Sequence, residues 1–182
     1  MLVKDAMTKP VVCCTPRDTA AVAAQTMELF GVGALPVVSA MFEPLLEGIV
    51  TDRDLCSGVL ASGKSPDAVL VGDVMTRVPV TCEPGDTLED CQELMRANQV
   101  RRIPVVNDRG HCVGIVAMTE VARSAGSLEL AATVREICEP TKEGWSLPAA
   151  GDYLYCGQTH ELDQIALLKR RREWRRREEV PT

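Results

Sequence analysis

The stretch Gly48-Ile49-Val50-Thr51-Asp52-Arg53-Asp54 reads as a short apolar strand that runs directly into the start of a helix. Ile49 and Val50 are β-branched and suit a buried strand. Thr51 can cap the following helix, and Asp54, three residues on, completes a capping-box pattern. The hydroxyl, the carboxylate and the backbone N–H groups of such a junction also suit the phosphate and ribose of a nucleotide. A capped helix without a ligand explains the same residues, so the stretch alone leaves both interpretations open.

The surroundings of this stretch occur twice in the chain. Three segments recur at an offset of 68 residues, namely Asp5-Ala6-Met7-Thr8 as Asp73-Val74-Met75-Thr76, Pro16-Arg17-Asp18-Thr19 as Pro84-Gly85-Asp86-Thr87, and Leu35-Pro36-Val37-Val38 as Ile103-Pro104-Val105-Val106. Gly48-Ile49-Val50 recurs as Gly114-Ile115-Val116 at an offset of 66, so the first copy has two extra residues in the loop before it. Two copies of this length indicate two related units rather than a solenoid.

Each copy predicts the same succession of strand, helix, strand, strand and helix. The expected strands are 11–13, 35–39 and 48–50, then 78–81, 103–106 and 112–116; the expected helices are 19–30 and 52–60, then 87–98 and 119–124. Apolar residues recur every three or four positions in the longer helices, as in Ala20, Ala23 and Met27. We therefore predict an α+β fold of two β-α-β-β-α units, 1–66 and 67–127. They should pack together because neither is large enough to be stable alone.

The composition disfavours several classes of protein. Aromatic residues make up only 3% of the chain, which argues against a stacking platform for single-stranded nucleic acid. The formal net charge of −6 disfavours nucleic acid or an anionic membrane as a partner of the whole body. The N-terminus resembles no signal peptide, and no apolar run is long enough to span a membrane. Several of the eight cysteines fall at apolar positions, which favours a reducing, cytoplasmic location.

The extension over 128–182 lies outside the repeat. Helical spacing of apolar residues predicts a helix over 127–138, and Pro and Gly residues predict loop over 139–159. A further helix is expected over 160–179, with a strongly basic centre over 169–177. This basic helix could contact nucleic acid or an acidic partner protein, or it could be a solvated helix that docks on the acidic body. We favour the docked helix, because one short basic run in an acidic chain is a weak signal.

The repeated segments Asp-Xaa-Met-Thr, Pro-Val-Val and Gly-Ile-Val occur twice in the same order over residues 1–127. They resemble those of a tandem pair of cystathionine β-synthase (CBS) domains, also called a Bateman module. The resemblance implies two repeats packed as a pseudo-twofold pair and a regulatory module without catalytic residues or a required cofactor. It also implies an adenosine-containing ligand between the repeats: AMP, ADP or ATP, with NADH and S-adenosylmethionine as alternatives. A homodimer is expected. The residues themselves show no nucleotide-phosphate glycine loop, no zinc-ligand spacing and no supported nucleophile motif.

The resemblance also assigns the residues of a nucleotide site. Asp54 matches the carboxylate that takes the ribose hydroxyls, and Thr51 matches the hydroxyl that contacts ribose or phosphate. Arg102, with Arg101 as a second candidate, matches the basic residue that reaches the phosphates from the opposite repeat; Arg53 is a weaker candidate. The adenine is expected to contact the segment that follows the first opening, namely Lys9, Pro10, Val11 and Val12. Val37 and Val38 would form the floor of the adenine pocket, although both would serve equally well as plain core residues. The arginine pair would also suit surface ion pairs.

The second copy departs from this pattern. Ala117 stands in place of Thr51, Glu120 in place of Asp54, and Ala34 is the counterpart of Arg102. We therefore predict one good nucleotide site and one degenerate or empty cleft. Two other hypotheses stay open, a dimeric interaction scaffold with vestigial clefts and a regulator that acts through its basic C-terminal helix.

Overall fold

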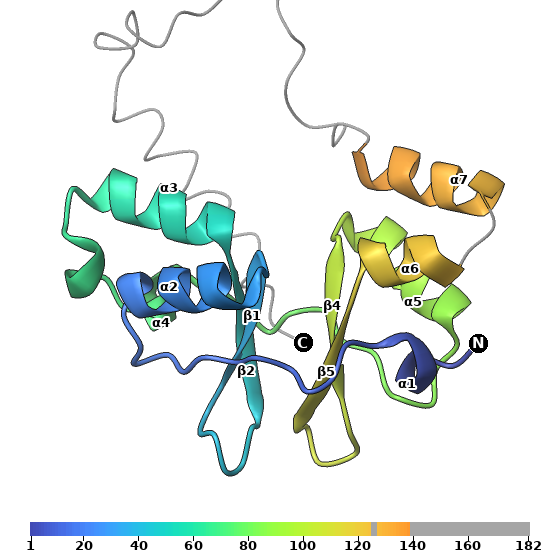
Figure 1. Cartoon of the computed structure of the whole chain (residues 1–182), viewed down its shortest axis with the longest axis horizontal. Helices are drawn as coiled ribbons and strands as arrows, with labels where there is room; N and C mark the ends of the chain where they lie inside the picture. Colours follow the sequence, from blue (N-terminus) through green and yellow to red (C-terminus); the bar gives the residue numbers. More distant parts are fainter. Residues whose placement is uncertain (125–126, 139–182) are drawn as a thin grey trace, which may run out of the picture. The chain divides into compact units, whose positions relative to one another are not determined.

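Helices and strands alternate twice along the part of the chain that the structure describes, residues 1–124 and 127–138 of 182 (Figure 1). The structure is a computed structural model. In chain order the elements are α1 Val3–Ala6, α2 Ala20–Phe30, β1 Ala34–Val38, β2 Leu46–Thr51, α3 Asp52–Ser62, the 3-10 helix η1 Pro66–Ala68, α4 Val71–Val74, β3 Thr76–Arg77, α5 Leu88–Asn98, β4 Arg102–Val106, β5 Cys112–Ala117, α6 Met118–Ser124 and α7 Ser127–Cys138. The expected loop over 139–159 and basic helix over 160–179 lie outside the described residues.

The two repeats share one strand register. β1 pairs antiparallel with β2, with Ala34 opposite Thr51, and β4 pairs antiparallel with β5, with Arg102 opposite Ala117. Both pairs carry an irregularity before their last matched residues. Because the side chains of a strand alternate between two faces, a shared register places equivalent residues of the two repeats on equivalent faces. The predicted α+β class and its repeated units are confirmed.

The opening of each repeat pairs with the last strand of the other repeat. Thr8 exchanges two backbone hydrogen bonds with Ile115 of β5, at 2.9 and 3.3 Å. In the same way β3 joins the edge of β2, with Thr76 opposite Ile49. Glycine makes this approach possible, since a Cβ at Gly48 would stand 2.7 Å from the carbonyl oxygen of Thr76.

The packed cores follow this exchange. Val3, which is fully buried, belongs to the core of the second repeat together with residues of α5, β4 and β5. Val69, Val71 and Met75 belong to the core of the first repeat, with residues of α2, β1 and β2. The two cores therefore do not coincide with the continuous units 1–66 and 67–127, because each core takes in the opening that precedes the other copy.

The first expected strand of each copy, 11–13 and 78–81, is not formed. Each segment instead ends in a single parallel residue pair, Cys14 with Val37 in the first repeat and Cys82 with Val105 in the second. Prolines stand close to both ends of each segment, at 10 and 16 and at 79 and 84. Proline has no N–H to donate to a β-ladder. The few residues between the prolines are therefore too short a stretch to extend the ladder beyond one residue pair.

The helix starts follow the sequence. Thr51 caps α3 and Thr87 caps α5, each in a complete capping box with the aspartate three residues on. Gly31 ends α2 in the left-handed region, with φ of 64°, where glycine is favoured. The predicted helices therefore begin within one residue of their observed starts, and the chain leaves α2 through Gly31 toward β1.

The two repeats differ in what covers their helices. In the second repeat α7 packs on α5 and α6 (Figure 1), and Ile137 of α7 is only 7% exposed. Nε of Arg96 on α5 lies 3.5 Å from the carboxylate of Glu136 on α7, so an ion pair joins the two helices. In the first repeat the corresponding helices, α2 and α3, border an apolar groove of about 370 Å³. Its lining residues are Ala20, Ala24, Met27, Asp52, Leu55, Cys56, Val59, Leu60 and Pro66.

Candidate functional site

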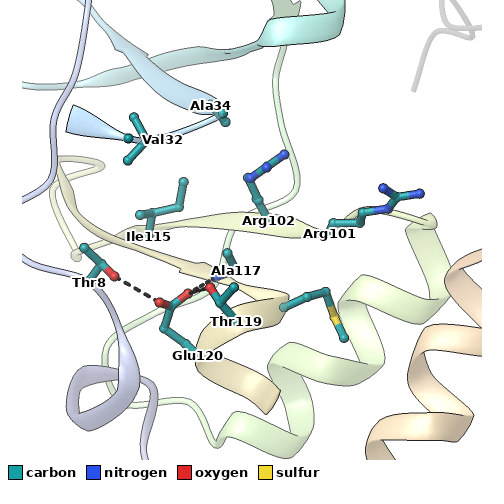
Figure 2. Close-up of a pocket in the computed structure, with 12 residues that line it drawn as sticks. Thr8, Val32, Ala34, Arg101, Arg102, Ile115, Ala117, Thr119 and Glu120 are labelled. Atoms are coloured by element: carbon teal, nitrogen blue, oxygen red, sulfur yellow. Dashed lines mark hydrogen bonds between the residues drawn. The ribbon is translucent and has the colours of Figure 1, made fainter. Parts of the chain in front are cut away.

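A cleft of about 290 Å³ is lined by residues of both repeats (Figure 2). The first copy contributes the turn between α2 and β1 and the end of its opening, and the second copy contributes the start of β4, the end of β5 and the start of α6. The lining residues are Thr8, Gly31, Val32, Gly33, Ala34, Arg101, Arg102, Ile115, Ala117, Met118, Thr119 and Glu120. Such a mixture of apolar walls and a few converging polar groups is typical of a small-molecule site.

Glu120 is the carboxylate of this cleft, and protein groups hold both of its oxygens. Oε2 accepts the backbone N–H of Ala117 at 2.9 Å and the hydroxyl of Thr119 at 3.0 Å. Oε1 accepts the hydroxyl of Thr8 at 3.3 Å, as Figure 2 shows, and lies 3.6 Å from Nη1 of Arg123. The longer glutamate thus makes the same N-terminal helix contact that Asp54 makes in the first repeat.

Asp54 has the simpler surroundings of the two carboxylates. Its Oδ2 accepts the backbone N–H of Thr51 at 2.9 Å and the hydroxyl of Thr51 at 2.6 Å. No hydrogen bond to Oδ1 is found among the described residues, so Oδ1 is available as an acceptor. The single hydroxyl proton of Thr51 is committed to Asp54, and this hydroxyl can therefore offer a ligand only an acceptor lone pair. Thr51 and Asp54 line neither the cleft nor the α2–α3 groove.

Arg102 reaches from the second repeat to the first. Its side chain extends from β4 toward Ala34 (Figure 2). A Cβ on Gly33 would stand 3.0 Å from Nη2 of Arg102 and 3.2 Å from Oδ2 of Asp52. The glycine therefore leaves room for a guanidinium beside the start of α3. Within residues 1–124 and 127–138, neither Arg101 nor Arg102 forms an ion pair, so both charges can face a ligand.

The structure brings the predicted site residues together in a different grouping. Arg101 and Arg102 line one cleft with Glu120 and Ala117, the two residues that the sequence placed in a degenerate cleft. Arg102 also ends beside Asp52, two residues before Asp54. Arg102 thus stands between the two motifs.

The remaining predicted residues lie at the edge of this region or in the core. Lys9 and Pro10 are exposed and follow Thr8, so the segment starts beside Glu120 and not beside Asp54. Val11 and Val12 are half-buried, and Val12 packs on the first core. Val37 and Val38 are fully buried in β1, and the side chain of Arg53 is exposed. None of these seven residues lines the cleft in Figure 2.

Sequence reasoning gave no site role to seven residues of the cleft: Thr8, Gly31, Val32, Gly33, Ile115, Met118 and Thr119. Thr8 carried a signal, since it closes a repeated opening, but its contact with Glu120 spans 112 positions of the chain. Gly33 carried none, because its role depends on an arginine from the other repeat.

The described residues hold no group of three or more His, Cys, Asp or Glu side chains arranged to bind a metal ion. Among the helices that the structure describes, none has the length and apolarity needed to cross a membrane.

Comparison with known proteins identifies the repeat. The sequence model of the CBS domain matches residues 3–61 and again residues 71–126. The CBS domain-containing protein YhcV of Bacillus subtilis is 39% identical over 129 residues, which cover 71% of this chain and 89% of YhcV. The protein MK0525 of Methanopyrus kandleri is 34% identical over 113 residues, or 62% of this chain, and the chain spans only 57% of its length.

Solved structures agree with this. CBSX2 of Arabidopsis thaliana, solved in complex with AMP, is 29% identical with a TM-score of 0.59, and the match covers 68% of this chain and 94% of CBSX2. The CBS domain pair of MJ0100, solved with 5′-methylthioadenosine and S-adenosyl-L-methionine, is 27% identical with a TM-score of 0.61 and is covered completely by 69% of this chain. The chain therefore belongs to the CBS domain family and carries two CBS repeats in tandem.

Proposed function

We propose that this chain is a regulatory module that binds an adenosine-containing ligand, such as AMP, between its two CBS repeats. The observation that carries the proposal is the cleft itself, which residues of both repeats line and which includes two arginines that form no ion pair with any described residue. The AMP complex of CBSX2 and the 5′-methylthioadenosine and S-adenosylmethionine complex of MJ0100 support the ligand class.

The groups present match the parts of such a ligand. Val32, Ile115 and Met118 offer apolar contacts to a base. Arg101 and Arg102 offer charge-assisted hydrogen bonds to a phosphate. A carboxylate can accept from both hydroxyls of a ribose, and Oδ1 of Asp54 is free to do so, whereas both oxygens of Glu120 already have partners. Asp54 does not line the cleft, but Arg102, which does, ends beside Asp52, two residues before Asp54. We therefore propose Asp54 as the ribose carboxylate of a ligand held by Arg102 and assign the phosphate to the arginines.

Regulation follows from the position of the cleft. A ligand that touches both repeats favours the arrangement of the repeats that it binds best, and it can shift the balance only by that difference in affinity. The readout would pass to a partner protein or to a second copy of this chain. No catalytic step is proposed.

The test is calorimetric titration of the full chain with AMP. Asp54→Ala should weaken binding about tenfold to a hundredfold, because it removes a charged hydrogen bond of about 1.5–3 kcal/mol. Asp67→Ala, an exposed carboxylate that lines neither pocket, is the matched control and should bind as the wild type does. Unchanged affinity of Asp54→Ala would refute its assignment. Absence of heat and of a thermal shift with AMP, 5′-methylthioadenosine and S-adenosylmethionine would refute the function.

A second candidate, an interaction scaffold that dimerises, is favoured by the open α2–α3 groove. Leu29, Phe30 and Leu60 on these two helices are 78%, 56% and 75% exposed. Leu60 lines this groove, and exposed apolar side chains beside an apolar groove are typical of an association surface. Sedimentation of Leu60→Asp against the wild type tests this role, and a scaffold requires the variant to lose a dimer that the wild type forms.

A further inference from the structure

We propose that the cleft selects adenosine-type ligands with at most one phosphate group, and that the carboxylate of Asp52 sets this limit. This inference rests on the proposed function, because it concerns the ligand of the same cleft. Comparison with known proteins does not set the number of phosphates, because CBS pairs have been solved with adenosyl compounds of very different charge, AMP in CBSX2 and S-adenosylmethionine in MJ0100.

The charges on the cleft wall nearly cancel. Three charged side chains line it, the cations Arg101 and Arg102 and the anion Glu120. Arg123 lies 3.6 Å from Glu120, but its side chain is 78% exposed and strongly screened by water. A binding site for a triphosphate needs a clear excess of positive charge, and the wall offers an excess of about one.

Asp52, although exposed, lies close enough to Arg102 to reduce that excess. Its Oδ1 accepts the backbone N–H of Arg53 at 2.7 Å, which fixes the carboxylate at the first turn of α3. Oδ2 of Asp52 lies 3.2 Å from the position that a Cβ on Gly33 would take. Nη2 of Arg102 lies 3.0 Å from the same position. The carboxylate therefore stands next to the end of the guanidinium without forming an ion pair with it. Any anion that binds this end of Arg102 has Asp52 as a close neighbour.

The consequence is a penalty that grows with ligand charge. One phosphate can be matched by the two arginines, whereas each further phosphate must approach the carboxylate of Asp52 or Glu120. Like charges separated by about 6 Å in a partly exposed site cost about threefold to tenfold in affinity per pair. Adenosyl ligands without phosphate meet no such repulsion. AMP, 5′-methylthioadenosine and S-adenosylmethionine therefore suit the cleft better than ADP, and ADP suits it better than ATP.

The experiment is calorimetric titration of the full chain with adenosine, AMP, ADP and ATP in magnesium-free buffer at low salt. We expect AMP to bind about tenfold more tightly than ATP. Asp52→Asn retains an oxygen that can accept from Arg53 but removes the charge. It should strengthen ATP binding about threefold to tenfold and leave adenosine binding unchanged. Asp67→Asn, which removes one exposed carboxylate elsewhere in the first repeat, should change neither.

Asp52→Ser, which also removes the charge and retains an oxygen at the start of α3, repeats the measurement if the asparagine variant does not fold. Two results would overturn the inference: ATP binding as tightly as AMP in the wild type, or an unchanged ratio of AMP to ATP affinity when the charge at position 52 is removed. Failure of the proposed function is distinguishable, because then neither adenosine nor any of the nucleotides binds.

Discussion

The two repeats share a register but differ at the face formed by their helices. In the second repeat α7 covers α5 and α6 and places Ile137 in the core, whereas in the first repeat α2 and α3 border an open apolar groove. They differ again at the motif that follows the last strand, where Thr51 and Asp54 correspond to Ala117 and Glu120. Within the described residues, one repeat is thus covered by an additional helix and the other presents an apolar groove, although both are built on the same pattern. The shared pattern sets the paired strands β1–β2 and β4–β5, and what covers the helices depends on sequence outside the repeat.

Removing the covering contact should have the largest effect. Ile137→Ala creates a cavity beneath α7 and should lower the free energy of unfolding by about 2–4 kcal/mol. Leu29→Ala, on the open face of the first repeat, should change it by less than about 0.5 kcal/mol, because that side chain is 78% exposed. Urea unfolding of both variants measures the contrast. Equal losses would mean that the α2 face is covered in solution, for instance by a second copy.

The glycines at the exchanged openings should show the next largest effect. Gly48→Ala places a Cβ 2.7 Å from the carbonyl oxygen of Thr76, and backbone cannot yield easily, so we expect a loss of about 1–3 kcal/mol. Gly114→Ala meets only the side chain of Met7, which can move, and should lose less. Gly85→Ala has nothing within 4 Å of the new Cβ and serves as the control. If Gly114→Ala proved the more damaging, the first opening, which carries Met7, would be the more rigid of the two.

The capping motifs should differ by a smaller amount. Thr51→Ala removes the one side-chain hydroxyl of the described residues that bonds to Asp54, and it should lower stability by about 1 kcal/mol. Thr119→Ala should have about half that effect, because Glu120 keeps its bonds to Ala117 and Thr8. Thermal unfolding followed by circular dichroism measures both. Equal losses would show that the glutamate depends on Thr119 as strongly as the aspartate depends on Thr51.

Local features of the fold were predictable from the sequence, and contacts between the repeats were not. The capping boxes at Thr51 and Thr87 depend on residues three positions apart, so spacing alone reveals them. The exchange of openings depends on backbone pairing across the whole chain, as between Thr8 and Ile115. The expected strands over 11–13 and 78–81 were wrong because the prolines beside them outweighed their β-branched residues.

The candidate site follows the same division. The residue types were predictable, since a carboxylate, a hydroxyl and an arginine pair stand out at repeated positions. Their grouping was not predictable, because it depends on where the side chain of Arg102 ends. The guanidinium reaches the turn at Gly33 only because a glycine lies there, and nothing near Arg102 in the sequence signals this. The proximity of Asp52 to Arg102 could not be predicted from the sequence for the same reason.

Cysteine reactivity gives the smallest and most local contrast. Burial, aided by the charge of Asp18, raises the pKa of Cys14 to about 12, so its thiol stays protonated in the folded protein. Cys56 on α3 is exposed. At pH 9 we expect a thiol reagent to modify Cys56 at least about a hundredfold faster than Cys14, because the thiolate is the reactive form. Peptide mass spectrometry after timed alkylation measures both rates.

The same shift gives the direction of the pH dependence. A thiol whose folded pKa exceeds its unfolded value of 9.0 binds more protons in the folded state between pH 9 and about 12, so its contribution to stability is complete below pH 9 and falls as the pH rises through that window. Cys14 should become as reactive as Cys56 only when guanidinium unfolds the first repeat. Comparable rates in the folded protein at pH 9 would show that the segment ending at Cys14 opens readily, and that its single residue pair with Val37 does not hold it against β1.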